Sequence, residues 1–213
     1  EGIEGFNDEA TLNGESNKCI CLEFLNNSEA LCLFGTSNMD SFDDALEFRF
    51  KADDTWATAH EDDKAAVKHL WEWIYSCKGN PTKFLNEYEG YFGNDSPFAW
   101  YLITDYLMAV DNRAKNMMLV TWDGKIWYFI PYDMDTIFGE RNDSVLKYDY
   151  TITWETMDES IGSYAFAGHD SVLWELVRGC PDKLREVADK LRSTMSLEYV
   201  LKVFNEKQMG NWC

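Results

Sequence analysis

The sequence lacks the features that mark membrane proteins, secreted proteins and nucleic-acid-binding proteins. No apolar run approaches the roughly 20 residues of a membrane-spanning helix, and no basic segment followed by an apolar one opens the chain as a signal peptide would. Basic residues are also scarce, because 19 Lys and Arg stand against 38 Asp and Glu for a net charge of −19. Such a surface repels phosphate backbones and attracts divalent cations, so we expect neither nucleic acid nor a membrane as partner.

Cysteine pairs with the spacing of a metal site are absent. The six cysteines show no CxxC pair and no histidine at zinc-ligand spacing. Cys19 and Cys21 point to the same face of any strand that contains them, among apolar neighbours. We therefore expect buried thiols in a reducing environment rather than a disulfide scaffold. An initial Met is lacking as well, which predicts that the chain is a piece of a longer protein.

Apolar side chains are abundant: hydrophobic residues make up 46% of the 213 residues and aromatic residues 15%, which predicts a packed globular protein. Alternating apolar residues predict strands, and apolar residues at helical spacing predict helices. The expected strands are 17–34 (two strands around a turn), 46–51, the hairpin arms 117–122 and 125–130, and 148–154. The expected helices are 61–77, 97–110, 169–179, one from Pro181 and one after Ser196. A β-rich front and a helical rear predict an α+β protein.

The segment from Val110 to Gly139 gathers polar side chains around one apolar hairpin. Its Asp123–Gly124 turn, between two β-rich runs, is a strong hairpin signal. Asn116 precedes the first arm, and Asp133 and Asp135 follow the second. Because a hairpin brings its open ends together, we expect Asn116 and Asp133 to lie close in space. Carboxylate and amide oxygens are ligands that Mg²⁺ prefers, so the sequence predicts a magnesium site at this end of the hairpin.

The spacing of these residues is typical of enzymes that transfer phosphoryl groups. Protein kinases place a catalytic Asp and a metal-binding Asn in the pattern D-x-x-x-x-N, followed by a hairpin and a second metal-binding Asp. This chain has "DNRAKN" at 111–116 and "DMDTIFG" at 133–139. The first pattern alone arises by chance in acidic chains, but it becomes specific when the hairpin and the second pattern follow it. Arg113 and Lys115 stand where a cation can reach the transferring phosphate.

The stretch "AVDNRAKNMMLVTWDGKIWYFIPYDMDTIFG" (109–139) resembles the core of the CotH-like kinases, the spore coat protein H family. A weaker resemblance extends to "LEFRF", "WEWI" and "SVLWELVRGCPDKL", over about residues 45–205. The resemblance implies an atypical kinase fold that phosphorylates protein serines, with Mg²⁺ and ATP as cofactors. The chain is most similar to the CotH-like domains of large phage structural proteins. The expected partners are therefore a protein substrate or virion proteins, and the expected location is a phage virion or the bacterial cytoplasm.

The resemblance also implies a role for each polar residue of the segment. The implied set is Asp111 as catalytic base, Arg113 and Lys115 as phosphate contacts in catalysis, Arg113 also in nucleotide binding, and Asn116, Asp133 and Asp135 as metal ligands. Residues 1–60 are expected to be a β-rich remnant of the N-lobe, and 61–213 the helical C-lobe that carries the hairpin. A kinase also needs a strand lysine, paired to a helix glutamate, for the α- and β-phosphates. Lys18 and Lys51 are the strand lysines available, without an evident glutamate partner, and no glycine-rich loop is visible.

Simpler interpretations of these residues remain open. Asp111 and Asn112 can turn the chain after a helix, Asp133 and Asp135 can form turns at a strand end, and the nearby cations can neutralise the acids. For the whole domain, the alternative is a non-catalytic structural or host-interaction module of a phage particle with the same fold. Metal-dependent phosphoester hydrolysis uses similar carboxylates, but the additional histidines or acids of its two-metal sites do not cluster in this sequence.

Overall fold

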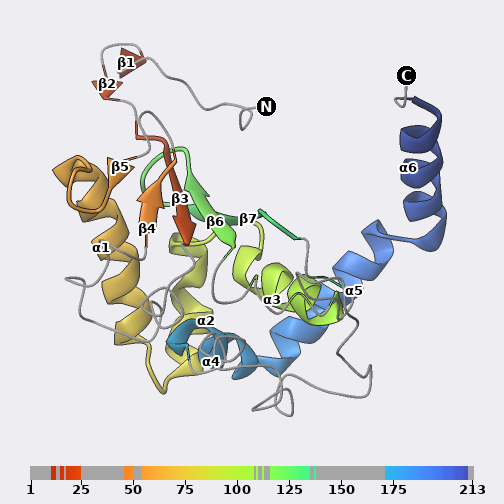
Figure 1. The fold of residues 1–213 in the computed structure, drawn as a ribbon. Coiled ribbons are helices and arrows are strands. Elements are labelled where there is room, and N and C mark those ends of the chain that lie inside the picture. Colours follow the sequence, from red (N-terminus) through yellow and green to blue (C-terminus); the bar gives the residue numbers. More distant parts are fainter. Residues whose placement is uncertain are drawn as a thin grey trace, which may run out of the picture.

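The computed structural model describes residues 11–12, 15–16, 18–24, 46–49, 54–107, 109, 112, 116–134, 137 and 171–210. Within these residues the protein is an α+β structure, as predicted. It combines a small antiparallel sheet with six α-helices and one short 3-10 helix (Figure 1). None of the described helices is both long and apolar enough to cross a membrane.

The larger sheet is antiparallel and has five strands in the order β5-β4-β3-β6-β7. The strands are β3 (Ile20–Phe24), β4 (Leu46–Phe48), β5 (Asp54–Thr55), β6 (Met117–Thr121) and β7 (Trp127–Pro131), and a separate hairpin joins β1 (Thr11–Leu12) to β2 (Glu15–Ser16). Because β3 pairs with both β4 and β6, strands from before residue 60 share one sheet with the central hairpin. The strands predicted within 17–34 and 46–51 are confirmed by β3 and β4. The second arm of 17–34 and the strand at 148–154 lie outside the described residues.

The predicted hairpin of β6 and β7 is confirmed over five paired positions. Gly124 in its turn has a φ of 71°, a left-handed conformation that glycine adopts without steric cost. The Asp123 carboxylate accepts hydrogen bonds from the backbone N–H groups of Lys125 and Ile126, both at 2.8 Å. Burial alone would raise the pKa of Asp123, but these bonds and one from the Thr121 hydroxyl lower it below its usual value. Side-chain hydrogen bonds therefore fix the turn end of the hairpin.

The helices lie mainly to one side of the sheet, and the last of them stands apart from it (Figure 1). They are α1 (Glu61–Ser76), α2 (Pro81–Glu87), the 3-10 helix η3 (Tyr88–Gly90), α3 (Ser96–Tyr106), α4 (Val172–Arg178), α5 (Pro181–Thr194) and α6 (Leu197–Gly210). The helices predicted at 61–77, near 169–179, from Pro181 and after Ser196 are confirmed, and α3 ends before the predicted Val110. Helix α2 was not predicted, because "KGNP" was interpreted only as the end of α1. The Asn80 side chain instead starts a new helix by accepting a hydrogen bond from the Lys83 N–H at 3.0 Å.

Helix α3 is fixed to the edge strand β7. Trp100 on α3 stacks on Phe129 of β7, with ring centroids 5.9 Å apart and an interplanar angle of 10°. Both side chains belong to the buried core. The Phe129 N–H donates to the Ser96 hydroxyl at 2.7 Å, which occupies a donor that an edge strand would otherwise leave exposed. The chain that leaves α3 therefore starts from a defined position beside the hairpin.

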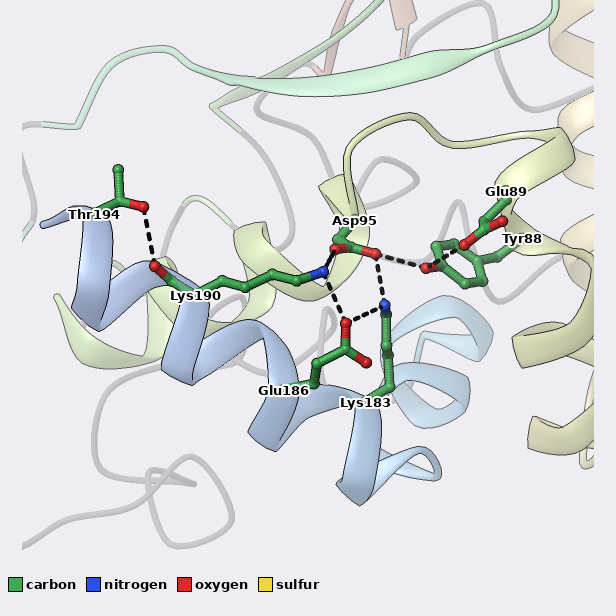
Figure 2. A network of polar contacts seen from close by, with 7 residues as sticks. All are labelled: Tyr88, Glu89, Asp95, Lys183, Glu186, Lys190 and Thr194. Atoms are coloured by element: carbon green, nitrogen blue, oxygen red, sulfur yellow. Dashed lines mark hydrogen bonds and ion pairs between the residues drawn. The ribbon is translucent and has the colours of Figure 1, made fainter.

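The beginning of α3 is tied to α5 by a polar network (Figure 2). Asp95, just before α3, accepts a hydrogen bond from the Tyr88 hydroxyl at 2.6 Å and pairs with Lys183 at 3.0 Å and with Lys190 at 2.9 Å. Burial alone would raise the pKa of Asp95, but the hydrogen bonds from these three partners lower it to about 2. The network thus holds the N-terminal end of α3 against α5, while the other end of α3 leads toward the hairpin.

Four cysteines are buried free thiols in the described part of the chain: Cys19, Cys21, Cys77 and Cys180. This confirms the burial predicted for Cys19 and Cys21. Burial, and secondarily the nearby Glu23 carboxylate, raises the pKa of Cys21 to about 11.

Candidate active site

Asn116 and Asp133 lie at the open end of the β6–β7 hairpin, just beyond the ends of the two strands. Asn116 directly precedes β6, and Asp133 follows β7 by two residues. The last paired residues at this end are Met117 and Pro131. The Asn116 N–H also donates to the carbonyl oxygen of Phe24 in β3 at 3.2 Å, which anchors this residue to the neighbouring strand.

One buried side chain joins the two sides of the open end. The Nδ2 atom of Asn112 lies 2.5 Å from the carbonyl oxygen of Asn116, 2.8 Å from that of Tyr132 and 3.5 Å from that of Asp133. The main chains of Asn116 and Asp133 are therefore both within reach of a single amide. Asn112 itself has an exposed fraction of 0%. The sequence pattern gave Asn112 only a turn role, because nothing local distinguishes a buried bridging amide from a turn residue.

Asn116 and Asp133 share an uncommon backbone conformation. Their φ angles are 50° and 47°, in the left-handed region. Asparagine and aspartate enter this region more easily than most residues with a side chain. Each residue therefore turns the chain away from the sheet just beyond the last pair of the hairpin, and the same two positions carry the predicted metal ligands.

The donor chemistry at this end fits a magnesium ion. Asp133 is exposed and Asn116 is half-buried, so an ion from solvent can reach both residues. Magnesium takes few ligands from protein and retains water or phosphate oxygens, and an amide with a carboxylate meets that requirement. Among the residues that the structure describes, no three His, Cys, Asp or Glu side chains gather as a metal site. The third predicted ligand, Asp135, lies outside them.

Of the other predicted site residues, the structure describes one, and four lie outside the described residues. Lys18 lies beside Gly124, at the turn end of the hairpin. Asn116 lies at the opposite end of β6, and a strand of five residues spans roughly 16 Å. The structure therefore does not bring Lys18 to the open end. The predicted residues outside the described part of the chain are Lys51, Asp111, Arg113 and Lys115, in addition to Asp135.

An ion pair lies on the face of the sheet that points away from the main core. Arg49, just after β4, pairs with Glu23 in β3 and with Glu47 at 3.2 Å. Glu23 has a side-chain exposure of 9% and stands opposite Met118 of β6, two positions from Asn116. This ion pair was not predicted from the sequence, although the alternation in "LEFRF" puts Glu47 and Arg49 on one face. Only the strand register shows that Glu23 joins them.

The family model described as CotH kinase protein matches residues 16–195, which is most of the chain. The chain belongs to this family. The match to the CotH kinase family contains the whole five-stranded sheet and helices α1 to α5, and α6 lies beyond it. A search of the curated proteins finds no match. Membership in the CotH kinase family confirms the resemblance and the kinase-like α+β fold, and it leaves the roles of single residues as predictions.

Proposed function

We propose that this CotH kinase domain transfers the γ-phosphoryl group of ATP to a serine hydroxyl of a protein, with Mg²⁺ as cofactor. The observation that carries the proposal is the joining of Asn116 and Asp133 at the open end of the hairpin. Catalysis of phosphoryl transfer depends mainly on positioning the reacting groups and on stabilising the charge of the phosphates. It therefore needs oxygen ligands that hold the metal ion in a fixed place. Membership in a kinase family supplies the reaction class.

Each polar residue of the segment has a role in this proposal. The amide oxygen of Asn116 and the carboxylates of Asp133 and Asp135 would hold Mg²⁺, which when bound neutralises charge on the phosphates. Asp111 orients the serine hydroxyl and accepts its proton as the new O–P bond forms and the bond to ADP breaks.

The cations of the segment and of the strands would contact the nucleotide. Arg113 and Lys115, which stand between Asp111 and Asn116 in the sequence, would contact the transferring phosphate. Lys51 remains the candidate for the α- and β-phosphates. Lys18 is not included, because it lies at the turn end of the hairpin.

The direct test is phosphorylation of an acceptor protein from γ-labelled ATP. With dephosphorylated casein as acceptor and Mg²⁺ present, we expect labelled phosphoserine, and chelation of the metal should abolish it. Asp111→Asn should lower the rate by about two orders of magnitude or more, as loss of a base and positioning group does. Asp123→Asn is the matched control, because it removes a carboxylate from the turn end of the same hairpin. An unchanged rate in Asp111→Asn would exclude the role proposed for Asp111.

The alternative function, a non-catalytic module of a phage particle, predicts a different response to ligands. In that case thermal unfolding of the unmodified protein should shift with Mg²⁺ or Ca²⁺ alone and show no further shift with ATP. A nucleotide-binding domain should instead gain stability with Mg-ATP, by about 2.7 kcal/mol at a ligand concentration of 100 times Kd. The same measurement therefore separates the two functions before any substrate is known.

A further inference from the structure

The side chain of Asn112 is surrounded by backbone acceptors at the candidate active site. Its Nδ2 faces the carbonyl oxygens of Asn116, Tyr132 and Asp133. An amide nitrogen has two hydrogens, so the contacts at 2.5 and 2.8 Å take both, and the contact with Asp133 at 3.5 Å is the weakest. The opposite orientation of the amide would place its oxygen against three other oxygens. The Nδ2 atom therefore faces the hairpin, and the buried Oδ1 atom has no hydrogen-bond partner among the described residues.

The backbone of Asn112 is anchored to α3 and to the residues that follow α3. Its carbonyl oxygen accepts a hydrogen bond from the indole N–H of Trp100 at 2.9 Å, and its N–H donates to the carbonyl oxygen of Ala109 at 3.2 Å. Trp100 in turn stacks on Phe129 in the core. The amide is therefore held by α3, and it cannot shift without disturbing buried aromatic packing.

Among the residues that the structure describes, few other contacts hold the two sides of the open end together. The last paired residues are Met117 and Pro131, and proline has no N–H to donate. Beyond this pair both chains turn away, at Asn116 and Asp133, through left-handed conformations. Without the Asn112 amide, the carbonyl groups of Asn116 and Tyr132 would approach each other with no donor from the described residues between them. Their mutual repulsion would then favour separation of the two sides.

We propose that Asn112 is the positioning residue of this site: its amide sets the spacing between Asn116 and Asp133, and thereby between the oxygen ligands that they carry. The ligand part of this inference rests on the proposed function. The contact of the Asn112 amide with the two sides of the open end, called the clamp below, does not rest on it. The effect of this clamp on the open end can be measured in the protein without any ligand.

Two substitutions of Asn112 and one control test the clamp. Asn112→Asp keeps the size but replaces the donor with an acceptor, and Asn112→Leu keeps the size without any polar atom. Thr121→Val is the matched control, because Thr121 is also fully buried and its hydroxyl accepts a hydrogen bond from the Gly124 N–H at the turn end of the same hairpin. All three variants should lose some global stability, so stability alone does not separate them.

Hydrogen exchange measured without ligand should separate the variants. In both Asn112 variants we expect exchange about tenfold faster at residues 116–118 and 130–134, with little change near Gly124, and the reverse in Thr121→Val. In Asn112→Asp, protection of the open end should return as the pH falls from about 8 to about 5, because a protonated carboxyl regains an O–H donor. Asn112→Leu should show no such return. Unchanged exchange at the open end of both Asn112 variants would overturn the inference, and if Asn112→Asp does not fold, Asn112→Leu decides it.

Binding of Mg-ATP then tests the ligand part. From the ligand-induced shift in Tm, measured against each variant's own baseline, we expect Asn112→Leu to weaken binding about tenfold or more and Thr121→Val to leave it within about twofold. Equal affinities in the two variants would show that Asn112 stabilises the fold without positioning ligands. If the unmodified protein gives no shift with Mg-ATP, the proposed function fails and the ligand part fails with it, while the exchange data still decide the clamp.

Discussion

The indole N–H of Trp100 donates a hydrogen bond to the backbone carbonyl of Asn112 at 2.9 Å, inside the core. This hydrogen bond connects the aromatic core directly to the backbone of a residue at the candidate active site. Trp100 stacks on Phe129 of β7, and Phe129 packs in turn against Phe92 and Trp174. Substitutions in this part of the core should therefore alter both the stability of the protein and the geometry of the open end of the hairpin.

Trp100→Phe should lower the free energy of unfolding by about 1–3 kcal/mol, because it keeps an aromatic ring but leaves the buried carbonyl of Asn112 without its donor. It should also weaken Mg-ATP binding. Trp73→Phe is the matched control, since the Trp73 indole donates to Glu87 at 3.0 Å, far along the chain from Asn112. Urea unfolding should show a loss in both variants, and a ligand-induced shift in Tm should change only in Trp100→Phe. A loss of binding in Trp73→Phe alone would contradict this prediction.

Asp95 should make the stability of the protein depend on pH in the acid range. Its partners lower the pKa of Asp95 to about 2 in the folded protein, against an ordinary value of 3.8. A folded pKa below the unfolded one means that the stabilisation is complete above about pH 4 and is lost as the pH falls through about 2. Asp95→Asn keeps a residue that tolerates its φ of 57°. Chemical unfolding should show that this variant is less stable at pH 7 and has a smaller loss of stability between about pH 4 and 2.

The two lysines of this network should differ in importance. The Lys183 side chain is 14% exposed and that of Lys190 is 57% exposed, although both pair with Asp95. An exposed ion pair contributes little because solvent screens it. Lys183→Met should therefore destabilise the protein more than Lys190→Met, as measured by urea unfolding at pH 7. Equal effects would mean that exposure does not govern this network.

Local sequence signals were sufficient to predict the elements whose main contacts are between residues close together in the sequence. The Asp123–Gly124 turn, with apolar arms on both sides, predicted the hairpin, and the turn chemistry explains why: Asp123 accepts two backbone hydrogen bonds from the residues that follow it. The helix after Ser196 was predicted from its N-cap, and the Ser196 hydroxyl does accept from the Tyr199 N–H at 3.2 Å. In both cases the decisive contacts span at most three residues.

Contacts between distant segments could not be predicted in this manner. The amide of Asn112 reaches Tyr132 across 20 residues, and Glu23 meets Arg49 across 26, so both depend on strand register. Lys18 shows the same limit, because only the pairing of β3 with β6 shows that it lies at the turn end of the hairpin. For α2, the signal itself was ambiguous, since Asn followed by Pro ends one helix as readily as it begins another.

The Cys21 thiol should be unreactive in the folded protein. Its pKa of about 11 leaves about one molecule in a thousand as thiolate at pH 8, and the side chain is buried. Iodoacetamide should therefore label Cys21 at least about a hundredfold more slowly in the native protein than in urea, as followed by peptide mass spectrometry. Rapid labelling of the native protein would mean that the outer face of β3 opens readily.

Asp133 allows charge and backbone effects to be separated at the candidate active site. Its side chain is exposed and its φ is 47°, so Asp133→Asn should leave stability nearly unchanged while it removes the negative charge of a proposed metal ligand. Asp133→Gly also removes the charge but relieves the left-handed strain, which should be neutral or slightly stabilising. Asp133→Ala combines loss of charge with a strain of about 1 kcal/mol.

Titration of Mg²⁺ in the presence of ATP should show all three Asp133 variants binding at least about tenfold more weakly than the unmodified protein, since each loses the same carboxylate. Urea unfolding should rank their stabilities as Gly and Asn above Ala. If affinity instead followed stability, with Asp133→Gly and Asp133→Asn close to the unmodified protein, the backbone conformation rather than the carboxylate would account for the binding. Loss of affinity in all three, whatever their stability, would identify the carboxylate as the group that matters.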